Sequence, residues 1–156
     1  MGLFKKKVDD GILRTNLIFI DGINSFAKGE VVTMSFDKEK REVAISSTVD
    51  KKRPSANLSI DKINVAKFMS ETEIKEKSKS VGGRAVVGGI LLGPLGALVG
   101  GVSGVGDKKK KTITNYIIIN YSEDKVLSFE IPPTNLNFRK VLTGINENIT
   151  QQDIEL

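Results

Sequence analysis

The chain has 156 residues, a formal net charge of +5 and a pI near 9.4, which favours anionic partners such as lipid headgroups, nucleic acid or an acidic protein surface. It contains no cysteine and no histidine, which excludes disulfides and thiolate chemistry and removes the commonest general base and zinc ligand. We therefore expect no metal, no cofactor and no catalytic residues. The hydrophobic content of 39% and charged content of 28% are those of an ordinary globular domain.

The first part of the chain has the alternating pattern of antiparallel strands. The pattern predicts strands over Thr15–Ile20, Val31–Phe36 and Glu42–Ser47, and the last two form a hairpin with one apolar face. Residues 56–60 and 63–68 are two further candidates, either separate strands or one bent strand. A polar stretch over residues 70–79 then leads into the centre of the chain.

The centre of the chain is a glycine zipper. Residues 85–106 carry no charge, and small residues recur at every fourth position from Ala85 to Gly101. A second ridge beside the first consists of Gly88, Gly96, Gly100 and Gly104. On a helix such ridges leave a face of nearly bare backbone, suited to close helix contact. We predict that the contact is made by Gly88, Gly89, Gly93, Ala97, Gly100 and Gly101.

This insert is predicted to fold back on itself as a hairpin of two short helices. Gly93 followed by Pro94 is the usual signal for the end of one helix and the start of the next. The arms VGGILLG and LGALVGG are near mirror images around the proline, and basic residues flank both ends. A hairpin keeps both flanks on one side, whereas a single crossing of a membrane would separate them.

The hairpin has three candidate destinations: one leaflet of a membrane, the surface of its own domain, or another copy of the chain. In a membrane, anionic headgroups would be bound by Arg84, Lys108, Lys109, Lys110 and Lys111. The alternative is a closely packed helical pair within a soluble assembly, because glycine contributes little to insertion.

After the insert, residues 114–122 give the strongest strand pattern, apolar on both faces and therefore expected to be central or covered. Another strand is predicted over residues 126–131. Two prolines end it, and Thr134 or Asn135 is expected to cap a closing helix. The apolar stripe of that helix consists of Phe138, Val141, Leu142, Ile145 and Ile149.

These elements predict an α+β fold, with a pleckstrin-homology-like split β-barrel or two-sheet sandwich, a C-terminal capping helix and the inserted glycine-rich helical hairpin. Residues 1–80 and 112–156 together form one β-rich domain, and residues 81–111 are the insert with its basic exit. The motifs MGLFKKK, KSVGGRAVVGGILLGPLGALVGG, YIIINYS and VLSFEI also resemble small proteins of low-GC Gram-positive bacteria and their phages. The resemblance implies a pleckstrin-homology-like domain carrying a glycine zipper, and it brings no catalytic residues.

The functional prediction is a non-enzymatic binding or scaffolding module. Its hairpin would mediate peripheral membrane association, self-association into a homo-oligomer, or both, on the cytoplasmic side of the membrane. The alternative is a soluble phage-type interaction protein that binds and inhibits a host or defence component. We do not expect nucleic acid as a partner, because aromatic content is only 6% and no recognised binding module accompanies the lysine runs.

Overall fold

The computed structural model describes residues 11–78, 86–87, 90–100 and 113–149. Seven antiparallel strands form one sheet in the order β4-β3-β2-β1-β9-β8-β5. Their bounds are β1 Ile12–Asp21, β2 Val31–Asp37, β3 Glu42–Ser47, β4 Ala56–Ser59, β5 Ile63–Ser70, β8 Asn115–Tyr121 and β9 Lys125–Ile131. The pleckstrin-homology-like architecture of strands followed by a C-terminal helix is thus confirmed.

The long strand β1 joins the two halves of the sheet. Its first part, Ile12 to Ile18, pairs with β2, and its end, from Ile18 to Asp21, pairs with β9 across a bulge. Because β1 belongs to both halves, the strands form one continuous ladder and not two separate sheets. The inward side chains of both halves nevertheless meet in one core, as expected for a sheet that bends back on itself.

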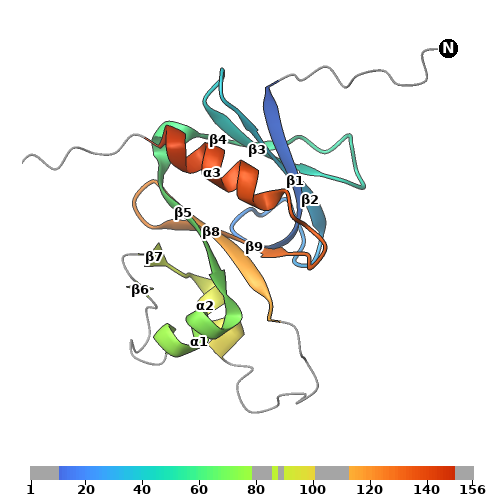
Figure 1. Cartoon of the computed structure of the whole chain (residues 1–156). Helices are drawn as coiled ribbons and strands as arrows, with labels where there is room; N and C mark the ends of the chain where they lie inside the picture. Colours follow the sequence, from blue (N-terminus) through green and yellow to red (C-terminus); the bar gives the residue numbers. More distant parts are fainter. Residues whose placement is uncertain (1–10, 79–85, 88–89, 101–112, 150–156) are drawn as a thin grey trace, which may run out of the picture.

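Helix α3, Phe138–Asn148, packs on this core across β1, β2 and β5 (Figure 1). Phe138, Val141, Leu142 and Ile145 are buried, which confirms the predicted stripe at helical spacing. The predicted cap is wrong, because Asn137 is the N-cap residue and makes no side-chain capping bond. Asn135 instead donates to Thr15 Oγ1 and to the carbonyl oxygen of Asn16, so it holds the start of the helix against β1.

Two features around β5 differ from what the sequence pattern predicts or leaves open. A 3₁₀ turn, η1 Ile60–Lys62, separates β4 from β5, so the two candidates are distinct strands. After β5 comes a helix that we did not predict, α1 Glu71–Ser78, whose Ile74 is fully buried. Its start is satisfied locally, because the Ser70 hydroxyl accepts a hydrogen bond from the backbone N–H of Glu73.

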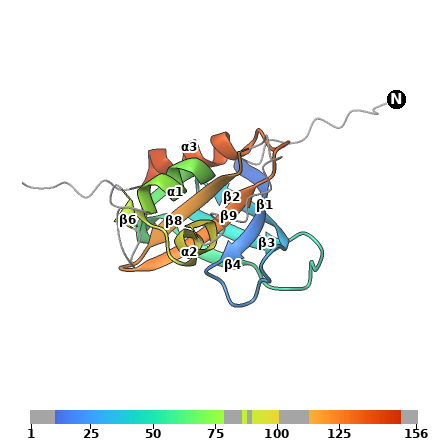
Figure 2. The ribbon, with the colours of Figure 1, turned by 90° about the horizontal axis from the view of Figure 1, so that it is seen from below.

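The described part of the insert lies on the opposite side of the sheet from α3. It comprises the short strands β6 Val86–Val87 and β7 Ile90–Leu91, which pair with each other, and helix α2 Pro94–Gly100. Seen from below, α2 lies over β8 and β9 (Figure 2). The sheet is therefore packed on both faces in this region, as the apolar pattern of both faces of β8 predicted.

Candidate functional site: the docked insert

The insert is held on the sheet by a second apolar cluster, separate from the main core. The insert contributes Ile90, Leu92, Leu95 and Val99, which are at most 4% exposed. The rest of the domain contributes Ile20, Met69, Ile74, Tyr116 and Ile118. Every strand residue in this second group points away from the main core, because its neighbours along the strand point into it. The outer face of β1, β5 and β8 is thus built to receive the insert.

A polar clamp fixes the register of this contact. The backbone N–H of Leu91 donates to Asn120 Oδ1 at 2.8 Å, and Asn120 Nδ2 donates back to the carbonyl oxygen of Leu91 at 2.9 Å. The side-chain amide of Asn120 therefore pairs with β7 as the backbone of another strand would. Asn120 is only 5% exposed, so losing either bond would leave a polar group buried without a partner.

The turn between β7 and α2 depends on Gly93 and Pro94. Gly93 has φ +57°, a conformation that side chains disfavour, and a Cβ placed there would lie 3.3 Å from Cβ of Val126. Pro94 is the first residue of α2, where its missing N–H costs nothing, as the sequence predicted. Gly93 thus serves a tight turn over β9, and its predicted part in a helix contact stays a prediction.

The predicted helix before Pro94 is wrong for the residues that the structure describes. Val86 pairs with Leu91 and Val87 with Ile90 in an antiparallel ladder. The physical reason is local: β-branched residues on either side of a Gly-Gly dipeptide favour a two-residue hairpin, and each glycine inside a helix costs roughly 1 kcal/mol. Leu91 also gains its bonds to Asn120, which a helix would not offer in this form.

The other predicted site residues are only partly covered. Gly100 is the last residue of α2. Ala97 lies inside the same helix, but its side chain is outside the described part of the chain. Gly88, Gly89, Gly101, Arg84 and Lys108 to Lys111 also lie outside the described residues. Both the zipper contact and the headgroup contact therefore stay predictions.

The buried cluster contains two further polar groups. Burial, with the carboxylates of Glu130 and Glu71 nearby, raises the pKa of the Tyr116 phenol from 10.0 to about 12. The Ser128 hydroxyl is fully buried on β9 and has no hydrogen-bond partner among the described residues. Ionisation of the Tyr116 phenol is therefore disfavoured in this position.

At the other end of the sheet, an ion pair holds two loops together. Arg53 Nη1 lies 2.8 Å from Glu30 Oε1, and the guanidinium stacks over the Phe26 ring. The Glu30 carboxylate also accepts from the N–H of Ala27 and from the Ser47 hydroxyl. These hydrogen bonds, that of Ala27 foremost, lower the pKa of Glu30. The sequence pattern indicates no role for this group, and we interpret it as a structural link.

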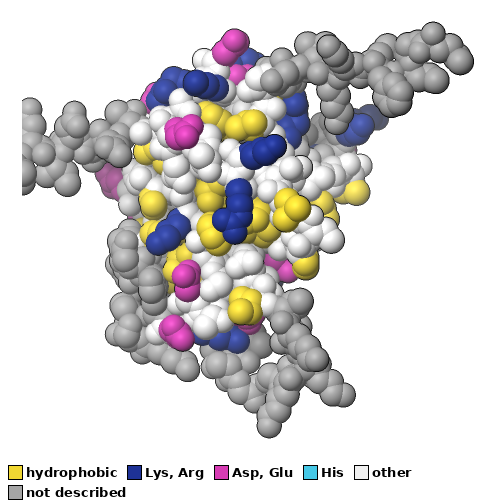
Figure 3. All heavy atoms as spheres, in the orientation of Figure 1, with side chains coloured by type: hydrophobic (Ala, Val, Ile, Leu, Met, Phe, Trp, Pro, Cys, Tyr) yellow, Lys and Arg dark blue, Asp and Glu magenta, His cyan; other side chains and the backbone are white. Residues whose placement is uncertain are grey.

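The described ranges offer neither a metal site nor a membrane-spanning helix. No group of three or more carboxylate, histidine or cysteine side chains there could hold a metal ion. None of the helices in those ranges is long and apolar enough to cross a membrane. On the face that carries α3, positive and negative side chains are interspersed (Figure 3). The described surface on that side therefore presents no continuous basic field.

The comparisons with known proteins agree with this architecture. Residues 24–133 match a family described as glycine zipper containing PH domain, a range that includes β2 to β9 and the whole insert. Comparison with curated proteins found no match, and neither did comparison with solved structures. The match covers well over half of the 156 residues and includes every strand of the sheet except β1, together with the glycine-rich insert. The chain belongs to the family of glycine zipper containing PH domains.

Proposed function

We propose that this chain is a non-enzymatic binding module that attaches to a protein partner. We further propose that its insert stays packed on the outer face of the sheet as part of the folded domain. The clamp between Asn120 and Leu91 carries this proposal, because it fixes a specific position of the insert on the sheet. Fold and family support the coarser function of a binding or scaffolding module. We also propose that the chain consists of a β-rich domain and an insert over residues 81–111. We propose a cytoplasmic location for it.

Entry of the hairpin into a membrane competes with this docking. Release of the insert would expose Met69, Ile74 and Ile118, which are all at most 1% exposed. At roughly 1.5–3 kcal/mol for each buried side chain, these three alone cost about 5–9 kcal/mol. Attraction of headgroups to Arg84 and to Lys108 through Lys111, at about 1 kcal/mol for each charge, contributes roughly 5 kcal/mol. Because exposing these three side chains costs at least as much free energy as the headgroup attraction returns, the docked insert is favoured.

Two finer alternatives remain from the sequence. Peripheral membrane association through the lysines alone needs no release of the insert, and it would depend strongly on salt. Self-association through the zipper needs only the small residues that do not face the sheet. Each alternative predicts a different result from that expected of a monomeric protein-binding module. One experiment can therefore distinguish the three.

The test is flotation on anionic liposomes with the mass of the unbound protein measured in parallel. Deleting the insert is a poor control because it would expose the apolar face beneath. We instead compare the full chain with Asn120→Ala, which loosens the clamp, and with Asn146→Ala, the same change at an exposed position of α3. The proposal predicts that the full chain and Asn146→Ala stay unbound and monomeric, whereas Asn120→Ala gains flotation or mass.

Three results would contradict the proposal. If the unaltered chain floats and salt abolishes the flotation, the chain binds the membrane surface through its basic residues. A salt-independent oligomer of the unaltered chain would assign it to zipper assembly. Equal behaviour of Asn120→Ala and Asn146→Ala would show that the clamp does not control the insert.

A further inference from the structure

The sheet ends at β4, and the free edge of this strand is accessible. In the part of the chain that the structure describes, β4 pairs with β3 alone. The Ile60 N–H donates to the carbonyl oxygen of Arg41 at 2.9 Å, so Glu42 and Ser59 form a non-hydrogen-bonded pair. Because bonding alternates along an antiparallel ladder, Asn57 directs its N–H and C=O away from β3. Asn57 is exposed and no described group bonds to its backbone, so both groups are open to an added strand.

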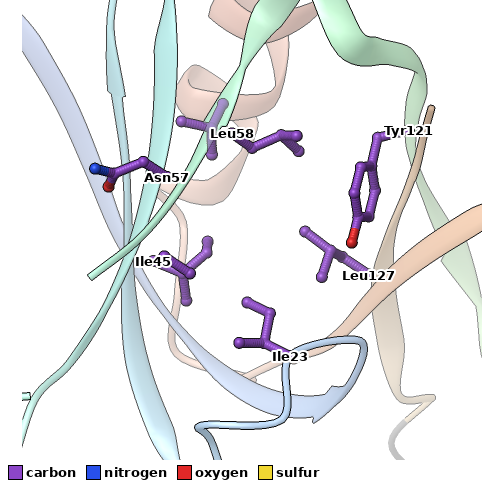
Figure 4. A pocket seen from close by; sticks show the side chains of 8 residues that line it. Ile23, Ile45, Asn57, Leu58, Tyr121 and Leu127 are labelled. Atoms are coloured by element: carbon purple, nitrogen blue, oxygen red, sulfur yellow. The ribbon is translucent and has the colours of Figure 1, made fainter. Parts of the chain in front are cut away.

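A small apolar hollow lies beside this edge (Figure 4). Besides Asn57, it is lined by Ile23, Val43, Ile45, Ala56, Leu58, Tyr121 and Leu127. Its volume of about 80 Å³ is well below the roughly 300–1,000 Å³ of pockets that bind free ligands. An engineered apolar cavity of about 150 Å³ holds benzene, so a hollow of half that volume has room for one aliphatic side chain.

A strand added to β4 would aim its side chains alternately into this hollow and away from it. Ala56 and Leu58 pack against the main core, whereas Asn57 between them faces the outer side of the sheet. Residues directly opposite each other in a ladder point to the same face. The added residue opposite Ala56 therefore points into the hollow, where the short side chain of Ala56 leaves space. The floor is preformed, because Ile45 and Leu127 are at most 3% exposed and are held by the core.

The charges around this edge favour an acidic partner segment. Lys51 and Lys52 precede β4, are exposed, and have no ion-pair partner among the described side chains. The acidic side chains on either side of β4, Asp50 and Asp61, each lie within 4 Å of an arginine. An antiparallel segment would approach the two lysines after its residue in the hollow, so an acidic residue is favoured at that end.

We propose that the edge of β4 binds an extended segment of a partner protein as an added antiparallel strand, with one aliphatic side chain in the hollow and acidic residues after it. Backbone hydrogen bonds supply affinity, and the side chain in the hollow, the anchor, supplies specificity. This inference rests on the proposed attachment to a protein partner, and it adds the site and the chemistry of the partner segment. The insert takes no part in it.

The probe is the peptide TVTLTEE with both ends blocked and a fluorescent label. In the proposed register its leucine is the anchor opposite Ala56, and its second threonine lies opposite Asn57. We expect saturable binding by fluorescence anisotropy and slower hydrogen exchange of the Asn57 amide in the bound chain. Replacing the leucine by alanine should weaken binding about tenfold. Replacing both glutamates by glutamine should weaken it about twofold to fivefold, as for exposed charge pairs.

Two N-methylated peptides test the pairing of the backbone without any change to the protein. The second threonine of the peptide directs its N–H toward Asn57, so N-methylation there removes a hydrogen bond and blocks the approach. It should weaken binding at least about tenfold. The valine one position earlier directs its N–H away from β4, so N-methylation there is the matched control and should leave the affinity nearly unchanged.

A matched pair of variants tests the place of the anchor. Ala56→Leu fills the hollow with the chain's own side chain, so the leucine and alanine peptides should bind it equally. Ala44→Leu adds the same bulk to β3 on the outer face, and it should keep the tenfold preference for leucine.

Four results would overturn the inference: no saturable binding of TVTLTEE, equal affinity of the two N-methylated peptides, an undiminished preference for leucine in Ala56→Leu, or protection of β5 in place of β4. The peptide comparisons on the unaltered chain decide the matter even if a variant fails to fold. If the unaltered chain stays monomeric and unbound to liposomes but binds no peptide, the site fails and the proposed function stands. Flotation of the unaltered chain overturns the proposed function whether or not the peptide binds.

Discussion

Asn120 binds Leu91 through both ends of its side-chain amide, and this pair joins strand β8 to the insert across 29 positions of the sequence. The two bonds reproduce the pairing between neighbouring strands with one side chain. A side chain that imitates backbone accepts only one register of its partner. The position of the insert is therefore specific, beyond what the non-directional apolar contacts around it would impose.

Replacing Asn120 by alanine is expected to destabilise the domain by about 2–4 kcal/mol, because the N–H and C=O of Leu91 both lose their buried partner. Urea denaturation measures the loss, and hydrogen exchange should show faster exchange of the Leu91 amide. Asn146→Ala should leave both quantities unchanged within about 0.5 kcal/mol. A loss of stability without faster exchange at Leu91 would argue against the clamp.

Gly93→Ala is expected to destabilise by about 1–3 kcal/mol, since the residue has a positive φ and its Cβ would crowd Val126. Gly11 has φ +71° with nothing within 4 Å of its Cβ, so Gly11→Ala measures the backbone strain alone. Thermal unfolding of both variants separates the two causes. The explanation by crowding fails if Gly93→Ala and Gly11→Ala cost the same, or if adding Val126→Ala recovers nothing.

Stability above pH 10 should depend on Tyr116. Its folded pKa of about 12 exceeds the unfolded value of 10.0, so its stabilising contribution is complete below pH 10 and declines as pH rises toward 12. At pH 11 the free energy of unfolding should have fallen by about 1 kcal/mol on this account. Tyr116→Phe should remove that part of the decline, and Tyr121→Phe should retain it. Parallel curves for the two variants would contradict the assignment.

The Glu30 carboxylate should contribute to the free energy of unfolding at neutral pH and not in acid. Its pKa is lowered in the folded state, so its contribution is present above the usual value of 4.5 and is lost as pH falls through the folded value. Glu30→Gln should therefore destabilise at pH 7, and the difference from the unaltered chain should shrink at pH 3. The exposed Glu147→Gln on α3 is the control, and a difference that persists at pH 3 would show that the carboxylate charge is not the cause.

Much of the sheet could be predicted because its signals are local. The alternation of β2 and β3 and the stripe of α3 follow directly from which residues face the core. The apolar character of both faces of β8 indicated that this strand is central or covered, and the structure shows that it is covered. That cover is the insert, a relationship that depends on contacts far apart in the sequence.

Contacts far apart in the sequence also contribute to the errors, in addition to the local preference of the Gly-Gly dipeptide for a hairpin. The first arm of the insert has small residues at helical spacing, yet Leu91 is stabilised as a strand by Asn120, which lies 29 positions away. Asn120 was missed because a polar residue at the end of a strand ordinarily faces water. The available signal was its place in the outward row with Tyr116 and Ile118, and it becomes informative only once that row is known to be buried.

The two ends of the central excursion are neighbours in space. Ser70 pairs with Asn115 in the ladder of β5 and β8, and the Glu71 N–H donates to the carbonyl oxygen of Thr114 at 2.8 Å. The excursion is thus an elongated tip of a β-hairpin, and doubling the length of such a tip costs only about 0.6 kcal/mol of closure entropy. A change in the length of this tip would therefore cost little closure entropy. Its docked side chains are constrained by packing, and among family members we expect them to change in concert with Met69, Ile118 and Asn120 beneath them.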